Sequence, residues 1–269
     1  NIYDNMAQAT SALTEASDVT AVALGDSTVV VTLAEYGNAV ITTAKLRGTS
    51  FLNVDADAAN IIGYNMVDSV DKLVSNVANA GTNVIYAQGS AGSRPASRVA
   101  VSDANTFGAQ EGRQAVAELR TASAPGFENG NYIGLVHPDV SYDLREQTAV
   151  TDVIQYQIRQ EGAAVRNGSI GVFGGIEWIE NPRAPILDDA GATGTTNVYQ
   201  TLVAGRQALA KAFSRAPGFG EDPSVVFGPV TDTLRRFHPV GWYHLVGHGI
   251  FRQAALRRIE SSSSIGDNT

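Results

Sequence analysis

The sequence predicts an α+β fold that combines an extended amino-terminal arm, a β ribbon, one long helix and a separate α/β lobe. Three observations support this prediction. Residues 1–27 are polar and alanine-rich, residues 28–46 are rich in β-branched side chains, and residues 55–79 carry an apolar stripe at helical spacing. The arm and the ribbon have little to pack on within the chain, so we expect other copies of the protein to cover them.

The β ribbon has the sequence TVVVTLAEYGNAVITTAKL over residues 28–46. Valine, isoleucine and threonine favour strands because their branched side chains pack well on a pleated surface. Gly37 and Asn38 interrupt this pattern, and we expect a break in the ribbon there. A long ribbon left exposed would invite aggregation, which again indicates that another chain covers it.

The clearest helix covers residues 55–79. Asp55 and Asp57 stand at its start, where acidic side chains interact well with the helix dipole, and Gly81 follows as a stop. A helix of this length measures about 37 Å, which is long for a domain of this size. We therefore expect an exposed spine, not a helix wrapped in a core. Its apolar stripe consists of Ala59, Ile62, Met66, Val70, Leu73 and Val77.

Strand and helix patterns then alternate on both sides of a domain boundary that we place near Asn129. Before the boundary we expect a short strand at 82–87 and a helix over 106–120. After it we expect a buried strand at 132–137 and a short helix from Pro138. A helical stretch, a glycine-dotted β-rich run, a strand turning into a helix and a strand-like end follow at residues 149–165, 168–182, 198–213 and 238–261.

The composition excludes several classes of function. The 269 residues carry a formal net charge of −8 and only 17% charged side chains. An acidic chain repels nucleic-acid phosphates, so sequence-specific binding of nucleic acid is disfavoured. The chain has no cysteine, which excludes disulfides and thiolate metal sites. No run approaches the about 20 apolar residues of a membrane span, so we expect no membrane partner.

The stretch LVHPDVSYDLR, residues 135–145, contains the side chains of a hydrolase, with His137 and Ser141 as candidate base and nucleophile. A serine nucleophile needs a histidine within hydrogen-bond reach and an acid behind that histidine. His137, Asp139 and Ser141 are too close in sequence to face each other across a turn, and no G-x-S-x-G elbow is present. Pro138 suits the first turn of a helix, so we interpret the polar residues as turn and capping groups.

His244 and His248 are four residues apart and could share a helix face, with His238 upstream. The zinc-protease pattern needs a glutamate directly after the first histidine, and this position is Leu245. Gly247 also argues against a helix. We interpret these histidines as surface or interfacial residues and expect no metal site.

Three further clusters have structural explanations. The run GVFGG at residues 171–175 lacks the spacing of a phosphate-binding loop. The acids of ILDDAGATG, Asp188 and Asp189, lack the further ligands of a calcium loop. Basic pairs near the end suit ion pairs between subunits, because arginine binds carboxylates bidentately; they are Arg235, Arg236, Arg257 and Arg258. We therefore expect no catalytic, cofactor-binding or metal-ligating residue.

Three segments in this order, YIGLVHPDVSYDLR, VRNGSIGVFGGIEWIENPRAP and VYQTLVAGRQALA, resemble tailed-phage major capsid proteins of the N-4 type. The early segment VTLAEYGNAVITT and the ending LRRIESSSS are also similar to that family. The resemblance covers most of residues 28–264. The sequence departs from the family in the insertion-like segment SRAPGFGEDPSVVFGPVTDTLRRF and in the region before Asn1.

The resemblance implies the HK-97-type phage capsid fold. Residues 1–27 would be the N-terminal arm and residues 28–50 the extended β loop. Residues 51–128 would form the peripheral domain with the spine helix 55–79, and residues 129–245 the axial domain at capsomer centres. Residues 246–269 would return to the peripheral domain and end in a tail. His137 to Arg145 would then be a strand–helix junction of the axial domain.

The function implied is self-assembly into homo-hexamers and homo-pentamers of an icosahedral shell that encloses double-stranded DNA without sequence-specific binding. The protein would be located in the virion after assembly in the host cytoplasm, with decoration, scaffold and portal proteins as further partners. A lysine–asparagine cross-link, for which Lys45 is placed near the β loop, is disfavoured, and removal of a leading segment would explain the absent methionine. The alternatives are an encapsulin-like cellular shell and a hydrolase that uses His137 and Ser141.

Overall fold

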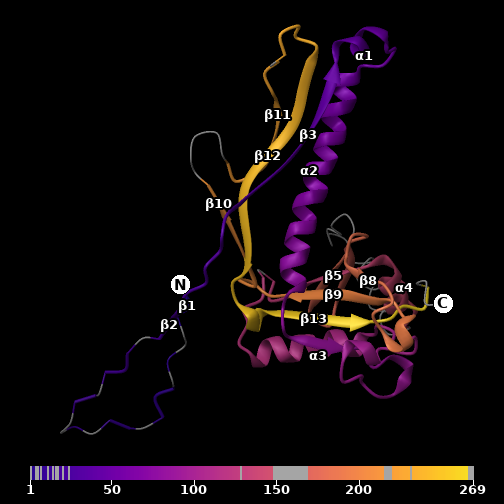
Figure 1. The fold of residues 1–269 in the computed structure, drawn as a ribbon. Coiled ribbons are helices and arrows are strands. Elements are labelled where there is room, and N and C mark those ends of the chain that lie inside the picture. Colours follow the sequence, from indigo (N-terminus) through magenta and orange to yellow (C-terminus); the bar gives the residue numbers. More distant parts are fainter. Residues whose placement is uncertain are drawn as a thin grey trace, which may run out of the picture.

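A long helix, α2 (Val54–Asn79), and a long strand, β12 (Phe237–Ile250), run side by side and set the shape of the chain (Figure 1). They belong to an elongated unit that stands on a compact lobe with a second sheet. The computed structural model describes residues 2–3, 6, 8–10, 12–13, 15, 18–19, 21–23, 25–127, 129–147, 169–214, 220–230 and 232–265.

β12 is the central strand of the elongated unit. β3 (Ala34–Thr43) pairs antiparallel with it along one edge. β11 (Ser224–Phe227) and β10 (Leu209–Phe213) follow one another along the opposite edge, also antiparallel. The short helix α1 (Ala44–Thr49) connects β3 to α2 at the end far from the lobe (Figure 1).

α2 covers one face of this sheet. Successive side chains of a strand point to opposite faces, so Val240, Trp242 and His244 point the same way. Trp242 Nε1 donates a hydrogen bond of 2.9 Å to Asn65 Oδ1 of α2, which identifies this face as the one that meets the helix. Val240, His244 and Ile62 of α2 are buried in this contact. The apolar stripe predicted from the sequence therefore exists to hold α2 on β12 and β3.

The compact lobe is built on a mixed seven-stranded sheet. In spatial order its strands are β4 (Val84–Tyr86), β13 (Leu256–Ser261), β9 (Val198–Ala204), β5 (Tyr132–Val136), β7 (Ile176–Glu180) and β6 (Ser169–Phe173), with β8 (Ile186–Leu187) paired to β9. Helices α3 (Ala109–Thr121) and α4 (Pro138–Glu146) contribute to the core of this lobe. The remaining elements are β1 (Ile2–Tyr3), β2 (Asp26–Ser27), η1 (Gly89–Ala91), η2 (Arg98–Ala100), η3 (Ala192–Gly194) and η4 (Gln253–Ala255).

Trp178 is the largest side chain in the core of the lobe, and the sequence leaves room for it. Its ring meets Phe107 edge to face with the two centroids 5.6 Å apart. A Cβ atom at Gly134 would lie 2.5 Å from Trp178, and one at Gly112 would lie 3.0 Å from it. These two glycines on β5 and α3 therefore let the helix approach the sheet closely over the indole.

The predicted domain boundaries do not coincide with the division into two sheets. β4 and α3, placed in segment 51–128, belong to the compact lobe, whereas β10 and β11, placed in segment 129–245, form the elongated sheet. The boundary at 245 falls inside β12, and β13, expected in the segment 246–269 with the peripheral domain, lies in the sheet of the lobe. The chain leaves the lobe after β9 and returns with β13. The assignment of residues 51–128 and 246–269 to a peripheral domain and of residues 129–245 to an axial domain stays a prediction.

The expected break at Gly37 and Asn38 is absent, because both residues lie inside the continuous strand β3. A Cβ atom at Gly37 would lie only 2.6 Å from the carbonyl oxygen of Trp242, so glycine permits close pairing with β12 here. One edge of this segment pairs with β12 of the same chain, and the expectation that another chain covers the ribbon stays a prediction.

Other expectations differ in detail. The long helix begins at Val54, one residue before the predicted 55. The second helix starts at Ala109, not at 106, because Thr106 forms a β-bridge with Ser262. Residues 198–213 form the two strands β9 and β10 without a helix, since both pair with neighbouring strands. The helix expected over 149–165 lies outside the described residues.

Candidate functional site

The polar stretch at residues 135–145 forms a strand–helix junction at the end of β5. His137 caps α4, and its Nδ1 accepts a hydrogen bond of 3.2 Å from the Asp139 backbone N–H. Ser141 Oγ lies 2.5 Å from Glu180 Oε1, which also binds Arg145 at 2.5 Å. The serine is thus hydrogen-bonded to a carboxylate and not to the imidazole, so this cluster lacks the relay of a serine hydrolase.

Tyr199 completes the packing around His137. The two ring centroids are 5.3 Å apart, and the Tyr199 hydroxyl donates a hydrogen bond of 2.9 Å to Asp139 Oδ2. Burial, together with this hydrogen bond to an acidic side chain, raises the pKa of Tyr199 well above its ordinary value. A phenol that stays protonated is a structural donor here, which agrees with a role in fixing the turn.

The remaining candidate clusters have structural partners or lack the geometry of a site. His244 and His248 lie on a strand, not on a helix. Among the described residues no group of three His, Asp or Glu side chains is placed to hold a metal ion. Gly174 and Gly175 have positive φ and form the turn between β6 and β7. The acidic residue Asp189 lies in a turn closed by Asn197 Oδ1.

The basic pairs, expected to reach other subunits, contact acidic residues of the same chain. Arg236 lies 3.5 Å from Asp232, and Arg257 lies 3.0 Å from Glu118. Arg236 and Arg257 thus have acidic partners within the chain, and the expectation that the basic pairs reach other subunits stays a prediction. Glu118 is 139 residues from Arg257 in the sequence, so local spacing does not reveal that pair. Asp232 and Arg236 are four residues apart, but they do not lie on a helix, where such spacing would predict an ion pair.

A buried ion cluster lies where α2 meets the compact lobe. Glu260 is fully buried on β13 and accepts hydrogen bonds of 2.6 and 2.9 Å from Arg98 and of 3.2 Å from Gln200. Arg258 Nε lies 2.9 Å from the same carboxylate, and its guanidinium also donates to the carbonyl oxygen of Asn79, the last residue of α2.

This cluster joins the two units electrostatically. The last turn of α2 has no basic residue of its own, so Arg258 supplies the positive charge that stabilises the end of the helix dipole. Burial raises the pKa of the Glu260 carboxyl, but the hydrogen bond from Arg98 and the charge of Arg258 outweigh this and hold the pKa below its ordinary value. The members of this cluster are far apart along the chain, so no local pattern in the sequence indicates it.

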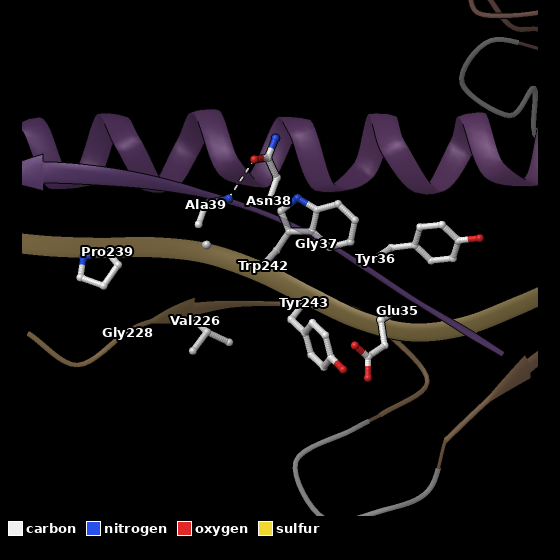
Figure 2. A pocket seen from close by; sticks show the side chains of 11 residues that line it. Glu35, Tyr36, Gly37, Asn38, Ala39, Val226, Gly228, Pro239, Trp242 and Tyr243 are labelled. Atoms are coloured by element: carbon white, nitrogen blue, oxygen red, sulfur yellow. Dashed lines mark hydrogen bonds between the residues drawn. The ribbon is translucent and has the colours of Figure 1, made fainter. Parts of the chain in front are cut away.

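The face of the elongated sheet that points away from α2 carries an apolar groove of about 710 Å3. Its lining includes Glu35, Gly37, Ala39, Val226, Gly241 and Tyr243. Figure 2 shows Asn38 and Trp242 on the side of α2 and Tyr243, Glu35 and Val226 away from it. Small residues form the floor, so extended backbone of another segment can approach closely.

The chain already uses this face in that way further along β12. The segment that leads into β3 crosses β12 (Figure 1), and Val31 and Thr32 lie directly over Gly247 and Gly249. A Cβ atom at Gly249 would lie 2.9 Å from Val31 Cγ2. Gly247 and Gly249 are two residues apart on β12, so they lie on one face of the strand. This spacing in the sequence indicates a surface on which an extended segment can pack closely.

Large apolar side chains remain exposed in two regions. In the arm, Leu13, Val19 and Val22 are 78%, 61% and 70% exposed. At the far end of the elongated unit, α1 and the β11–β12 connection lie close together (Figure 1), and Phe51, Leu52 and Leu234 are exposed there. Exposed apolar surface of this kind marks contacts with other protein chains. The fold thus defines a structural subunit of a larger assembly.

Comparison with known proteins identifies the assembly. A family model described as phage capsid protein matches residues 1–261. The fold is similar to the capsid of Ralstonia phage GP4, with 14% identity over 87% of this chain and 74% of that chain and a TM-score of 0.69. The cyanophage Pam1 capsid gives 14% identity, 98% and 84% coverage and a TM-score of 0.67. No curated protein matches.

The chain belongs to the phage capsid protein family. It is a major capsid protein, a structural subunit of an icosahedral shell and not an enzyme, as the resemblance implied. The SrpI encapsulin complex from Synechococcus elongatus is also similar, with 11% identity, 88% and 76% coverage and a lower TM-score of 0.54. The described residues contain no helix with the length and apolar character required to cross a membrane.

Proposed function

We propose that this chain assembles into hexamers and pentamers that close the shell of a tailed phage of the N-4 type around double-stranded DNA. The compact lobe would be the axial domain, and the elongated unit the peripheral domain. The subunit has a net charge of −8, and an acidic inner surface of the shell would repel DNA phosphates. The shell would therefore enclose the DNA without binding it tightly. Assembly would take place in the host cytoplasm, with portal, scaffold and decoration proteins as separate partners.

The observation that carries the proposal is the open groove together with the exposed arm. Val31 of the same chain shows that a valine in extended backbone fits the glycine floor of this sheet. Val19 and Val22 of the arm are exposed and have the same character. We propose that the arm of one subunit lies in the groove of the next. Each subunit would then bind one neighbour through its arm and another neighbour through its groove.

Assembly of groove variants tests this proposal. Val226 and Phe227 are adjacent on β11 and both exposed, but their side chains point to opposite faces of the strand. We expect Val226→Asp to abolish shells seen by electron microscopy and sedimentation while the free subunit stays folded, and Phe227→Asp to disturb assembly less. Equal effects of the two changes would contradict docking in the groove.

The arm provides the complementary experiment. Val22→Asp should reproduce the loss of shells caused by Val226→Asp, because both changes place a carboxylate in the same apolar contact. Shells that lack nucleic acid and enclose protein cargo would favour the encapsulin alternative. A small soluble oligomer formed by the unaltered chain, under conditions that permit assembly, would contradict the shell itself.

A further inference from the structure

Two histidines of β12 lie in the contact between α2 and the elongated sheet and have no role in the assembly described above. His244 is only 3% exposed, and neither of its ring nitrogens has a hydrogen-bond partner among the described residues. The Nε2 atom of His248 is also buried without a described partner. Both side chains point to the face on which Trp242 meets Asn65, so they point toward α2.

The groups around this pair are neutral or positively charged. Tyr36 of β3 lies opposite His244, and Lys211 of β10 lies opposite His248. A cavity of about 200 Å3 lies between α2 and the sheet at His248, and its walls include Lys211 and Val77 of α2. The neighbouring cavity at Tyr36 is lined by Lys72 of α2.

Carboxylates that could balance a charge on the pair are turned elsewhere in the described part of the chain. Neither of the two cavities has an Asp or Glu side chain in its lining. Asp222 is 3.5 Å from Lys211 but is largely in solvent, and Asp68 of α2 binds Arg183 of the lobe. A proton added to His248 would therefore create a positive charge beside Lys211 without a carboxylate among the described residues of the two cavities to balance it.

We propose that this histidine pair makes the contact between α2 and the elongated sheet sensitive to mild acid. At neutral pH the His248 imidazole, whose pKa is lowered, is uncharged and the contact is closed. When the pH falls below about 6, near the range where histidine in water gains its proton, protonation favours an open contact in which the rings reach water. The part of α2 around Asn65 stays attached to the elongated sheet, because neither Trp242 nor Asn65 titrates.

The sign follows from proton linkage. Burial, Lys211 and His244 lower the pKa of His248 below its ordinary value of 6.5. The open state therefore binds protons that the closed state excludes, and acid shifts the balance toward the open state. For each unit by which the pKa of His248 is lowered, the opening equilibrium rises about tenfold once the pH is below the lowered pKa. This opening would change how the elongated unit stands on the lobe.

Hydrogen exchange of the purified chain at pH 7.5 and 5.5, corrected for the intrinsic exchange rate, tests the inference. We expect peptides from residues 71–79 and 244–250 to lose several-fold more protection than peptides of the lobe core, because one histidine with an ordinary pKa of 6.5 can raise the opening equilibrium by at most about tenfold at pH 5.5. The double variant with His244→Leu and His248→Leu should lose this pH dependence, because the imidazoles are gone. It should still fold, because the described residues give no hydrogen bond to His244 or to Nε2 of His248. His238→Leu is the matched control on the same face, and it should retain the dependence because His238 lies near Asp55.

Unchanged protection of wild-type peptides at pH 5.5 would overturn the inference, and so would acid opening that persists in the double variant. If the double variant does not fold, imidazole titration of the wild-type chain by NMR decides. A His248 titration midpoint clearly below 6.5 supports the inference, whereas a midpoint at or above 6.5 contradicts it. These outcomes do not depend on whether the groove binds an arm, because they concern the free subunit.

Discussion

Replacing Glu260 by glutamine should show how much the buried ion cluster holds the two units together. The substitution preserves the shape of the side chain and removes its charge. Two guanidinium groups, those of Arg98 and Arg258, then lose their carboxylate. The side chain of Arg258 is only 11% exposed, whereas that of Arg98 is 37% exposed and is partly compensated by water.

The magnitude follows from this difference in burial. Breaking a buried ion pair by removing one partner costs about 3–5 kcal/mol, because it leaves an unpaired buried charge. The loss of the pair with the more exposed Arg98 should add no more than a surface ion pair does, about 0–1 kcal/mol. We therefore expect Glu260→Gln to lower the free energy of unfolding by about 3–5 kcal/mol at pH 7, mainly through Arg258.

Urea unfolding of the unassembled chain at several pH values measures this effect. The pKa of Glu260 is held below its ordinary value of 4.5, so its stabilisation is present above pH 4.5 and is lost as the pH falls through the lowered pKa. The gap between wild type and Glu260→Gln should therefore close in acid.

The matched control is Asp68→Asn, which removes the partner of Arg183 in a pair with side chains 53% and 55% exposed. That change should cost no more than about 1 kcal/mol. A loss below about 1 kcal/mol for Glu260→Gln at pH 7, or a gap that persists unchanged at low pH, would refute the assignment of a buried, charged cluster.

Two further changes test the helix contact and the polar junction. Trp242→Phe keeps an aromatic ring but removes one of the two donors to Asn65 Oδ1, which still accepts a hydrogen bond from Asn38 Nδ2. It should therefore cost about 0.5–1.5 kcal/mol in urea unfolding, the net value of one hydrogen bond. Ser141→Ala removes a hydroxyl that binds Glu180 and should leave shell formation, seen by electron microscopy, unchanged. Loss of a hydrolytic activity on Ser141→Ala would contradict the structural role of the junction.

Local signals in the sequence were sufficient for the elements with strong local patterns. The apolar stripe and the acids at the start of α2 predicted that helix to within one residue at its start, and Pro138 predicted the start of α4. The capping role of His137 was also foreseeable, because its hydrogen bond goes to a residue two positions on. These features depend on neighbours in the sequence, which a single chain displays.

Features that depend on distant partners could not be predicted in this way. Thr42 of β3 binds the carbonyl oxygen of His238, which is 196 residues later, so the pairing of β3 with its own chain was not visible. β10 contains alanine, leucine and lysine, which favour helices, but the edge of β12 imposes a strand. The Glu260 cluster likewise joins Arg98 across 162 residues.

β12 runs without interruption through the elongated unit and ends beside the lobe, and it is bonded to neighbours along both edges. Its ladder bonds stand perpendicular to the strand. A pull along the strand axis therefore loads many of these bonds in shear at the same time instead of opening them one by one. If pressure inside a filled head stretches the subunit along this axis, the strand acts as a tendon, and the mechanical strength of the elongated unit resides in its backbone.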